Sequence, residues 1–470
     1  MGGRAWSTRQ IMNKTKKIII STFSVLGIIL ISFGLIANAS YNFEKKDYNN
    51  LSKKVEVTHK KIETYKAIDK GIYDLEGNLF QIQGINYGNL LIQEGWMSVN
   101  SLGPKLNEDG SYAKINSEGV IEEYEEVYQE ELDLALKNNP NLNQEKINEL
   151  WSIYYKSYCQ EIDFQNIKEI GLNTIRLPMY YRNFLEGEDD KLVMKENAFE
   201  FIDYFLENAK KYDLKVILDM HGVVGGQSGN EHSGTRRTEF WTNEVYQKEM
   251  CDLWKNIASY YLNERKDLAS TILAYDLINE PALDKKETTK REWDVMDKMY
   301  KAIREVDEDH IIAIEGCWYF DSLPDPKKYN WENVMYEFHL YNWDNAKVSN
   351  DVYHTLHFFK WMTTNYDVPI YIGEFNFFDK KDEWIKWLNE YDERGLNWSI
   401  WSYKTISVGW WDMSWGIYVY KMNLRDEKLK LDVRTATYEE IKEVWSNQGT
   451  KETYKDTGVL KSVIEQHFKK

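Results

Sequence analysis

The sequence predicts an α/β fold in which eight parallel strands close into a (β/α)8 barrel, the TIM-barrel architecture. From Trp151 onward, short apolar runs alternate with longer segments that have the apolar spacing of helices. This alternation requires parallel strands covered by helices, and eight such strands close into a barrel. The length of 470 residues suits one large domain of this class that carries loop insertions.

The barrel elements can be placed along the chain in order. The expected strands are residues 81–86, 173–177, 215–220, 272–278, 310–314, 334–338, 370–373 and 397–401. The expected helices are residues 162–170, 198–212, 246–262, 293–304, 352–364 and 383–393, with two more beginning at Tyr438 and Gly458. A hairpin over residues 73–80 could plug the bottom of the barrel. The acidic stretch of about 98–150 is expected to be an insertion after the first strand.

The N-terminal part is expected to direct the chain to a membrane. Residues 1–39 hold five basic residues and no acidic one, and a mostly apolar run follows at 18–37. This pattern predicts a signal peptide cleaved after Ala39, with a retained membrane signal-anchor as the alternative because the run could span a bilayer. Residues 40–70 are polar and predict a linker to the domain at 71–470. The expected location is therefore extracellular or at the cell surface.

Charge and cysteine content exclude several classes of protein. The formal net charge is −17, and a surface of this sign repels phosphate backbones, so nucleic acid is not an expected partner. The three cysteines, Cys159, Cys251 and Cys317, are too few for a disulfide framework. No CxxC or HExxH pattern occurs, so neither a metal nor a cofactor is expected.

Polar side chains stand at the C-terminal ends of nearly all the expected strands. In a barrel these ends converge on one bowl, where active sites of this architecture lie. The residues that meet there are Asn86, Arg176, His221, Asn279, Glu280, His339, Tyr341, Glu374 and Trp401. Structural polar residues would account for one or two of these positions, and so the convergence predicts a catalytic site.

Two carboxylates at strand ends are the minimum set for acid/base and nucleophilic work on a glycosidic bond. Hydrolysis with retention needs one carboxylic acid to protonate the leaving oxygen and one carboxylate to attack the anomeric carbon. Glu280 and Glu374 lie on expected strands that face each other across the bowl. Arg176 could hold one acid ionised, and Asn279 could bind a sugar 2-hydroxyl.

These motifs resemble glycoside hydrolase family 5, a family of retaining (β/α)8 glycosidases that includes cellulases and β-glucanases. Residues 279–281 read Asn-Glu-Pro, as in the family's first motif, which implies Glu280 as the general acid/base. Residues 372–375 read Ile-Gly-Glu-Phe, as in its second motif, which implies Glu374 as the nucleophile. The resemblance covers roughly residues 71–420, and the motifs keep the family's order along the chain.

The remaining positions of the family pattern are also filled. Arg176 matches the arginine that supports the nucleophile, and His221 matches the histidine of the third strand. His339 and Tyr341 match the pair that flanks the cleaved bond. Trp401 matches the tryptophan under the sugar before the scissile bond. The resemblance therefore implies a complete catalytic set.

Two stretches bear on the substrate. Residues 84–90 with 94–96, and the glycine-rich residues 221–230, are similar to the exo-β-1,3-glucanase branch of the family, which implies a β-glucan polysaccharide or oligosaccharide. Endo-β-1,4-glucanase or mannanase specificity is the alternative within enzymes. A non-catalytic, membrane-anchored carbohydrate-binding protein is the alternative of another class. Further sugar platforms or packing residues are Trp343, Trp410, Trp411 and Trp415.

Overall fold

The computed structural model describes residues 51–470 apart from 112, 115–124, 126, 282–288, 317–322, 342–347, 379, 407–414, 421–429, 457 and 470. Residues 52–470 form one compact unit. The predicted signal segment 1–39, and with it the run at 18–37, lies outside the described residues, as do Cys317, Trp343, Trp410 and Trp411.

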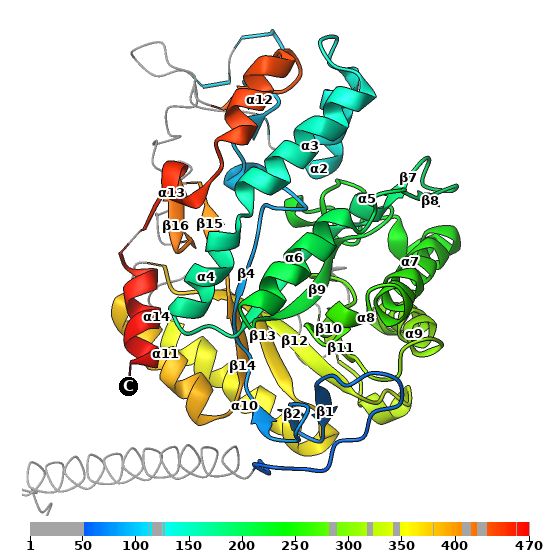
Figure 1. Cartoon of the computed structure of the whole chain (residues 1–470), viewed down its shortest axis with the longest axis vertical. Helices are drawn as coiled ribbons and strands as arrows, with labels where there is room; N and C mark the ends of the chain where they lie inside the picture. Colours follow the sequence, from blue (N-terminus) through cyan, green and yellow to red (C-terminus); the bar gives the residue numbers. More distant parts are fainter. Residues whose placement is uncertain are drawn as a thin grey trace, which may run out of the picture. The chain divides into compact units, whose positions relative to one another are not determined.

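Eight parallel strands form a closed barrel in chain order, as predicted (Figure 1). They are β4 (Gln83–Asn86), β6 (Thr174–Tyr180), β9 (Lys215–Gly222), β10 (Ile272–Asp276), β11 (Ile311–Glu315), β12 (Val334–Tyr341), β13 (Ile370–Asn376) and β14 (Asn397–Ile400). The barrel closes where β14 pairs in parallel with β4. Strands buried on both faces need continuous apolar runs, and this is why each of them could be located in the sequence.

Helices surround the barrel, and each predicted helix is found within a few residues of its expected bounds. They are α4 (Glu161–Glu169), α6 (Glu200–Lys211), α7 (Glu244–Asn263), α9 (Thr289–Arg304), α10 (Val348–Tyr366), α11 (Lys381–Glu393), α12 (Tyr438–Ser446) and α14 (Leu460–Phe468). Capping side chains determine where two of these helices begin. Thr437 and Glu440 form a capping box at the start of α12, and the Asn243 side chain accepts the backbone N–H of Val245 at the start of α7.

A small antiparallel sheet closes one end of the barrel. It consists of β1 (Lys66–Ile68), β2 (Gly71–Tyr73) and β3 (Leu79–Phe80), and β2 and β3 form the predicted hairpin. Tyr65 and Ile72 are buried in one cluster with residues from the first half of the barrel strands, among them Ile217 and Met335. The sheet therefore covers the N-terminal end of the barrel, opposite the end at which the predicted site residues lie.

The predicted linker of residues 40–70 is wrong for residues 60–70, which are part of the domain. One oxygen of Asp309 accepts the backbone N–H of Lys60 at 2.9 Å, and the other accepts those of Lys61 at 2.6 Å and Ile62 at 3.0 Å. Lys66 Nζ lies 2.8 Å from the same carboxylate. The sequence does not predict this attachment to the domain, because the stretch is polar, the contacts use backbone groups and the partner lies far away in the sequence.

Asp309→Ala should detach this N-terminal segment. Burial raises the pKa of Asp309, but Lys66 and the three backbone N–H groups outweigh it and lower the pKa to about 2. The ionised carboxylate therefore stabilises the fold above the unfolded pKa, and this contribution is lost as pH falls through about 2. At neutral pH we expect the variant to lose about 1–3 kcal/mol of unfolding free energy. Hydrogen exchange of residues 60–68 should rise.

Glu308→Ala is the matched control for that substitution. Glu308 pairs with Lys60, but their side chains are 41% and 66% exposed, so loss of this pair should cost about 0–1 kcal/mol. An equal loss in both variants would contradict a specific role of Asp309.

An insertion follows β4, where the acidic stretch was expected. Its described parts are β5 (Asn100–Ser101), α2 (Gln129–Asn138) and α3 (Gln144–Tyr158). The helix α2 contacts the loop that follows β9. There Glu130 donates its backbone N–H to the carbonyl of Gly234 at 2.9 Å, and its carboxylate lies 2.7 Å from Arg237. The insertion is thus attached to a loop at the C-terminal end of the barrel strands.

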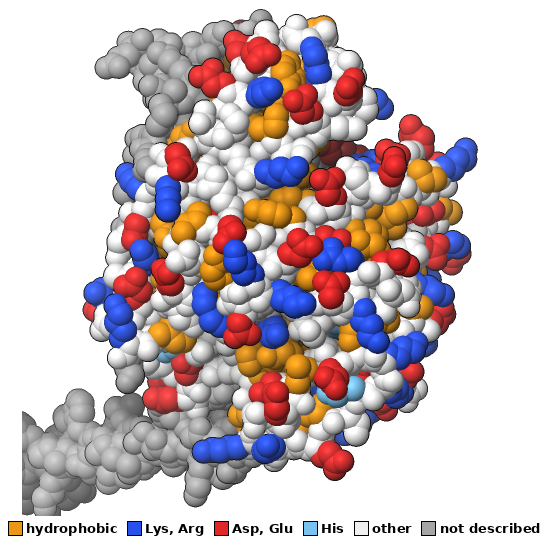
Figure 2. Space-filling model, in the orientation of Figure 1, with side chains coloured by type: hydrophobic (Ala, Val, Ile, Leu, Met, Phe, Trp, Pro, Cys, Tyr) orange, Lys and Arg blue, Asp and Glu red, His pale blue; other side chains and the backbone are white. Residues whose placement is uncertain are grey.

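Charges of both signs are spread over the surface. On the face shown in Figure 2, acidic and basic side chains are interspersed with one another and with small apolar areas. Among the residues described by the structure, no helix has the length and apolar character needed to cross a membrane.

Candidate active site

Arg176, on β6, is the fully buried centre of the site. Its Nη1 donates to Glu374 Oε1 at 2.9 Å and to Asn86 Oδ1 at 3.1 Å. Its Nη2 donates to Asn279 Oδ1 at 2.9 Å and to Asp276 Oδ2 at 2.8 Å. One guanidinium therefore fixes four side chains that come from three different parts of the chain.

More carboxylates than expected surround this arginine. Besides Glu374 and Asp276, Asp219 Oδ2 lies 3.1 Å from Nη1 and Glu337 Oε1 lies 3.1 Å from Nε. Burial raises the pKa of Asp219 to about 7, although Arg176 lowers it. Burial also raises the pKa of Glu337, but Arg176 and the neighbouring histidine outweigh it and lower the pKa. The carboxyl groups around Arg176 therefore include both ionised groups and groups that hold protons near neutral pH.

Glu374, on β13, is held in place by two hydrogen-bond donors. Arg176 binds its Oε1, and the hydroxyl of Tyr341 donates to its Oε2 at 2.7 Å. Burial and the charge of Glu374 raise the pKa of Tyr341 well above its usual range, so the phenol keeps its proton and remains a donor. A carboxylate fixed in this way is suited to nucleophilic attack.

Glu280 lies just beyond the end of β10, which stops at Asp276, a little earlier than expected. Its backbone is left-handed, with φ of 39°. This conformation is costly for a residue with a side chain and is found at functional sites. The backbone N–H of Glu280 donates to Glu315 Oε2 at 2.7 Å, which secures the turn.

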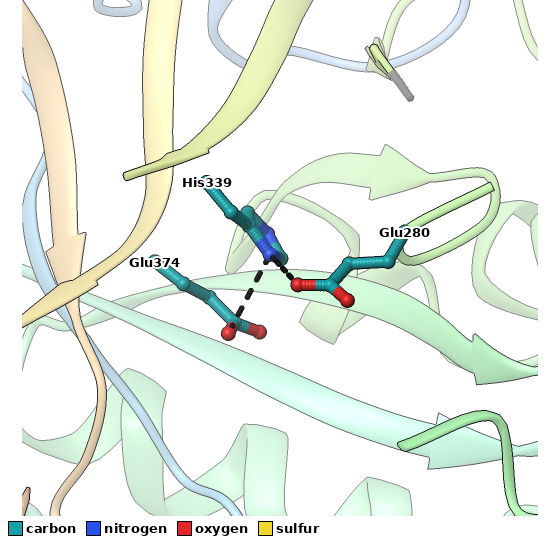
Figure 3. Close-up of side chains that lie close together, drawn as sticks. All are labelled: Glu280, His339 and Glu374. Carbon is teal, nitrogen blue, oxygen red and sulfur yellow. Dashed lines mark hydrogen bonds and ion pairs between the residues drawn. The ribbon is translucent and has the colours of Figure 1, made fainter. Parts of the chain in front are cut away.

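His339 lies between the two glutamates, as Figure 3 shows. Its Nδ1 is 2.8 Å from Glu280 Oε1 and 3.5 Å from Glu374 Oε2. Burial lowers the pKa of His339, but Glu315 and Glu374 outweigh it and raise the pKa well above the usual range. Burial raises the pKa of Glu280, yet His232 and His339 outweigh it and lower the pKa to about 2. The imidazole therefore carries a positive charge between two carboxylates.

The spacing of the two glutamates decides which chemistry they can perform. One oxygen of Glu280, one of Glu374 and a nitrogen of His339 all lie within 4.8 Å of one another. Carboxyl groups about 5–5.5 Å apart suit retention, whereas inversion needs about 6.5–9.5 Å to admit a water molecule. The pair therefore has the geometry of a retaining glycosidase.

Two groups of side chains have the composition of a metal site. One is Glu280, His339 and Glu374, and the other is Glu315, Glu337 and His339. Arg176 places a permanent cation 2.9 Å from Glu374 and 3.1 Å from Glu337, which repels a metal ion. We therefore assign both groups to proton transfer and charge balance.

Asn86, Asn279 and His221 complete the predicted set. Asn86 donates to the carbonyl of Gly373 at 2.8 Å, which ties β4 to the strand that carries the nucleophile. Because Oδ1 of Asn279 is held by Arg176, its amide nitrogen is the group left to bind a sugar hydroxyl. His221 Nδ1 lies 2.6 Å from Asp219, and burial lowers the pKa of this histidine well below its usual range.

Trp401, at the end of β14, is buried against neighbouring rings. Its indole lies parallel to His221, with ring centroids 5.7 Å apart and an interplanar angle of 15°. It also packs in a cluster with Met97 and Trp415. Trp401 and Trp415 are only 3% and 7% exposed, so both indoles are packed among neighbouring side chains.

All nine predicted residues meet at one end of the barrel, but the sequence analysis missed five neighbours. These are Asp219, Asp276, Glu315 and Glu337, which interrupt or end apolar strands, and His232, which follows the glycine-rich stretch. The four acids could have been identified from the sequence, because a charged residue inside a buried strand needs a partner. His232 could not have been, because only the path of the loop brings it to Glu280.

The closed barrel and the paired glutamates at its strand ends place this protein among (β/α)8 proteins with a glycosidase-type site. The cellulase family, glycosyl hydrolase family 5, matches residues 134–407. The chain belongs to this family.

Individual relatives match a smaller part of the chain. A β-xylosidase of Phanerodontia chrysosporium is 31% identical over 43% of this chain and 41% of its own length. Endoglucanase C of Acetivibrio thermocellus is 31% identical over 40% of this chain and 52% of its own. A glucan 1,3-β-glucosidase of Kluyveromyces lactis is 29% identical over 43% of each. The chain thus spans about half or less of the length of these relatives.

Solved structures show the same fold. The rutinosidase of Aspergillus niger superimposes with a TM-score of 0.53 over 74% of this chain and 98% of that protein, at 14% identity.

Proposed function

We propose that the protein is a retaining glycoside hydrolase that cleaves β-glucans. The observation that carries the proposal is the pair of glutamates with oxygens within 4.8 Å, one of them held by Arg176 and Tyr341. Membership of the family supports hydrolysis of a glycosidic bond. The names of two relatives, an endoglucanase and a glucan 1,3-β-glucosidase, support a β-glucan as the substrate.

The roles of the residues follow from their contacts. Glu374 attacks the anomeric carbon while Glu280 gives a proton to the leaving oxygen, and a glycosyl ester of Glu374 forms. A bound sugar removes water from Glu280, which favours its protonated form. Glu280 then takes a proton from water, and the resulting hydroxide equivalent cleaves the ester. The amide of Asn279 would bind the sugar 2-hydroxyl, and Trp401 would contact the sugar ring.

The products of hydrolysis test both the substrate and the mechanism. Laminarin, cellulose oligomers, lichenan and mannan should be compared under identical conditions. Glucose alone from laminarin would indicate an exo-β-1,3-glucanase, whereas mixed oligomers would indicate an endo-acting enzyme. Proton NMR should show the β-anomer first, because two displacements restore the configuration. An initial α-anomer would refute the retaining mechanism.

The same panel separates the alternatives. Preferred cleavage of cellulose oligomers or mannan would indicate endo-β-1,4-glucanase or mannanase specificity. Binding of a glucan with no product from any substrate would indicate a non-catalytic, membrane-anchored carbohydrate-binding protein. The presence of both acids and of their supporting residues favours an enzyme.

We also propose that the protein is exported and acts outside the cell or at its surface. The basic segment followed by the apolar run 18–37 and by the small residues Ala37 and Ala39 supports a cleaved signal. N-terminal sequencing of the protein from the culture medium should begin at Ser40. Recovery of the uncleaved chain from membranes would support a retained anchor.

A further inference from the structure

Both carboxylate oxygens of Glu280 have a histidine partner. His339 Nδ1 lies 2.8 Å from Oε1, and His232 Nδ1 lies 3.3 Å from Oε2. The side chains of His232 and Glu280 are only 16% and 12% exposed, so water competes little with this contact. His339 belongs to the motif pattern of the family. His232 belongs to none of the motifs in the sequence.

Ser228 determines which nitrogen of His232 carries the hydrogen. The Ser228 hydroxyl oxygen accepts the backbone N–H of Asn230 at 3.2 Å and lies 3.0 Å from His232 Nε2. With its oxygen engaged, the hydroxyl is free to donate its own hydrogen to Nε2. In either protonation state of the imidazole, we therefore place a hydrogen on Nδ1, from which it points to Glu280 Oε2.

The loop that carries His232 is fixed to the barrel. Gln227 donates its side-chain amide to the carbonyl of His221 at 2.7 Å and to that of Asn279 at 3.0 Å. The indole of Trp241 donates to the carbonyl of Gln227 at 2.7 Å. The short helix η2 (Glu231–Ser233), which contains His232, therefore stands at a defined position relative to Glu280.

We propose that His232 is a positioning residue for the acid/base Glu280 and that its Nδ1–H stabilises Oε2 as this oxygen gives up its proton. The inference rests on the proposed glycosidase function. Because His339 Nδ1 binds Oε1, the proton of Glu280 is carried by Oε2. As the C1–O bond breaks and Glu374 bonds to C1, that proton passes to the leaving oxygen and Oε2 gains negative charge. The bond from His232 strengthens at this moment, which is what accelerates a reaction.

Leaving groups of different basicity test this role. A 2,4-dinitrophenolate departs without protonation, whereas the sugar hydroxyl of a natural glucan requires it. His232→Leu should therefore lower kcat/KM about 10- to 100-fold on the best glucan oligosaccharide, which corresponds to one hydrogen bond to a charged group. On the matching 2,4-dinitrophenyl glycoside, kcat/KM should change little. His232→Asn, whose amide keeps a donor near the place of Nδ1, should recover most of the loss.

Two further variants serve as controls. Ser228→Ala should lower kcat/KM in the same direction but less, because the hydrogen is no longer directed to Nδ1. This substitution also tests the proposal if His232→Leu fails to fold. His354→Leu, an exposed histidine on α10, should leave both substrates unaffected.

Each outcome is decisive. Equal losses on both substrates, or equal losses for the Leu and Asn variants, would show that His232 only supports the fold and would overturn the proposal. If the wild-type protein cleaved neither substrate, the proposed function itself would fail, and the inference would fail with it.

Discussion

Glu374→Gln should abolish turnover while the protein remains folded. The amide cannot attack the anomeric carbon, and so kcat on the best glucan should fall on the order of 10⁴-fold or more. The side chain keeps its shape, and its one remaining oxygen can still accept a hydrogen bond from Arg176 or from Tyr341. Thermal unfolding should therefore show an intact cooperative transition. Near-wild-type hydrolysis by this variant would refute the assignment of the nucleophile.

Chemical rescue makes this test specific. In Glu374→Ala, azide can enter the space of the lost carboxylate and attack C1 of a 2,4-dinitrophenyl β-glycoside. One displacement then yields the α-glycosyl azide, which NMR identifies. Glu332→Gln, an exposed glutamate, is the matched control and should keep full activity. Rescue that yields a β-azide would place the nucleophile elsewhere.

Arg176→Met should have the largest effect on stability. The guanidinium lies within 3.1 Å of Asp219, Asp276, Glu337 and Glu374, all of them buried. Without it, these carboxylates lose their shared cation, and we expect the free energy of unfolding to fall by about 3–5 kcal/mol at neutral pH. Denaturant titration measures this loss.

The pH dependence of that loss identifies its cause. Arg176 lowers the pKa of Asp219 and of Glu337 against the effect of burial, so their pKa values should rise in the variant. A carboxyl group whose folded pKa is raised destabilises the fold at high pH, and the penalty disappears as pH falls below that pKa. The deficit should thus be smaller at pH 5 than at pH 8. Arg434→Met, which removes an exposed pair with Asp432, should cost about 0–1 kcal/mol at either pH.

The barrel could be predicted because its strands are buried on both faces and therefore consist of short runs of mostly apolar residues. The same property located the site, since parallel strands end together and side chains at their ends must meet. Glu280 is the informative exception. Its strand ends at Asp276, and the acid stands on a left-handed turn held by Glu315, a contact between distant strands that no local pattern contains.

The charge around Arg176 could be predicted only in part. The sequence indicated one acid beside this arginine, whereas the structure shows four. Asp219, Asp276 and Glu337 occur within apolar strands, which indicates that each has a buried partner but not which one, because the common partner is on β6. The role of residues 60–70 was missed for a related reason. Backbone N–H groups have no sequence signature, so their convergence on Asp309 could not be foreseen.

The attachment of α2 to Gly234 has a consequence for how relatives of this protein can diverge. Glu130 contacts the residue two positions beyond His232, so the inserted helix and the positioning residue His232 share one loop. The insertion is therefore not a freely exchangeable module. Another insertion in this barrel would shift the loop and with it the contact between His232 and Glu280, and natural substitutions in α2 should be accompanied by compensating ones in the loop.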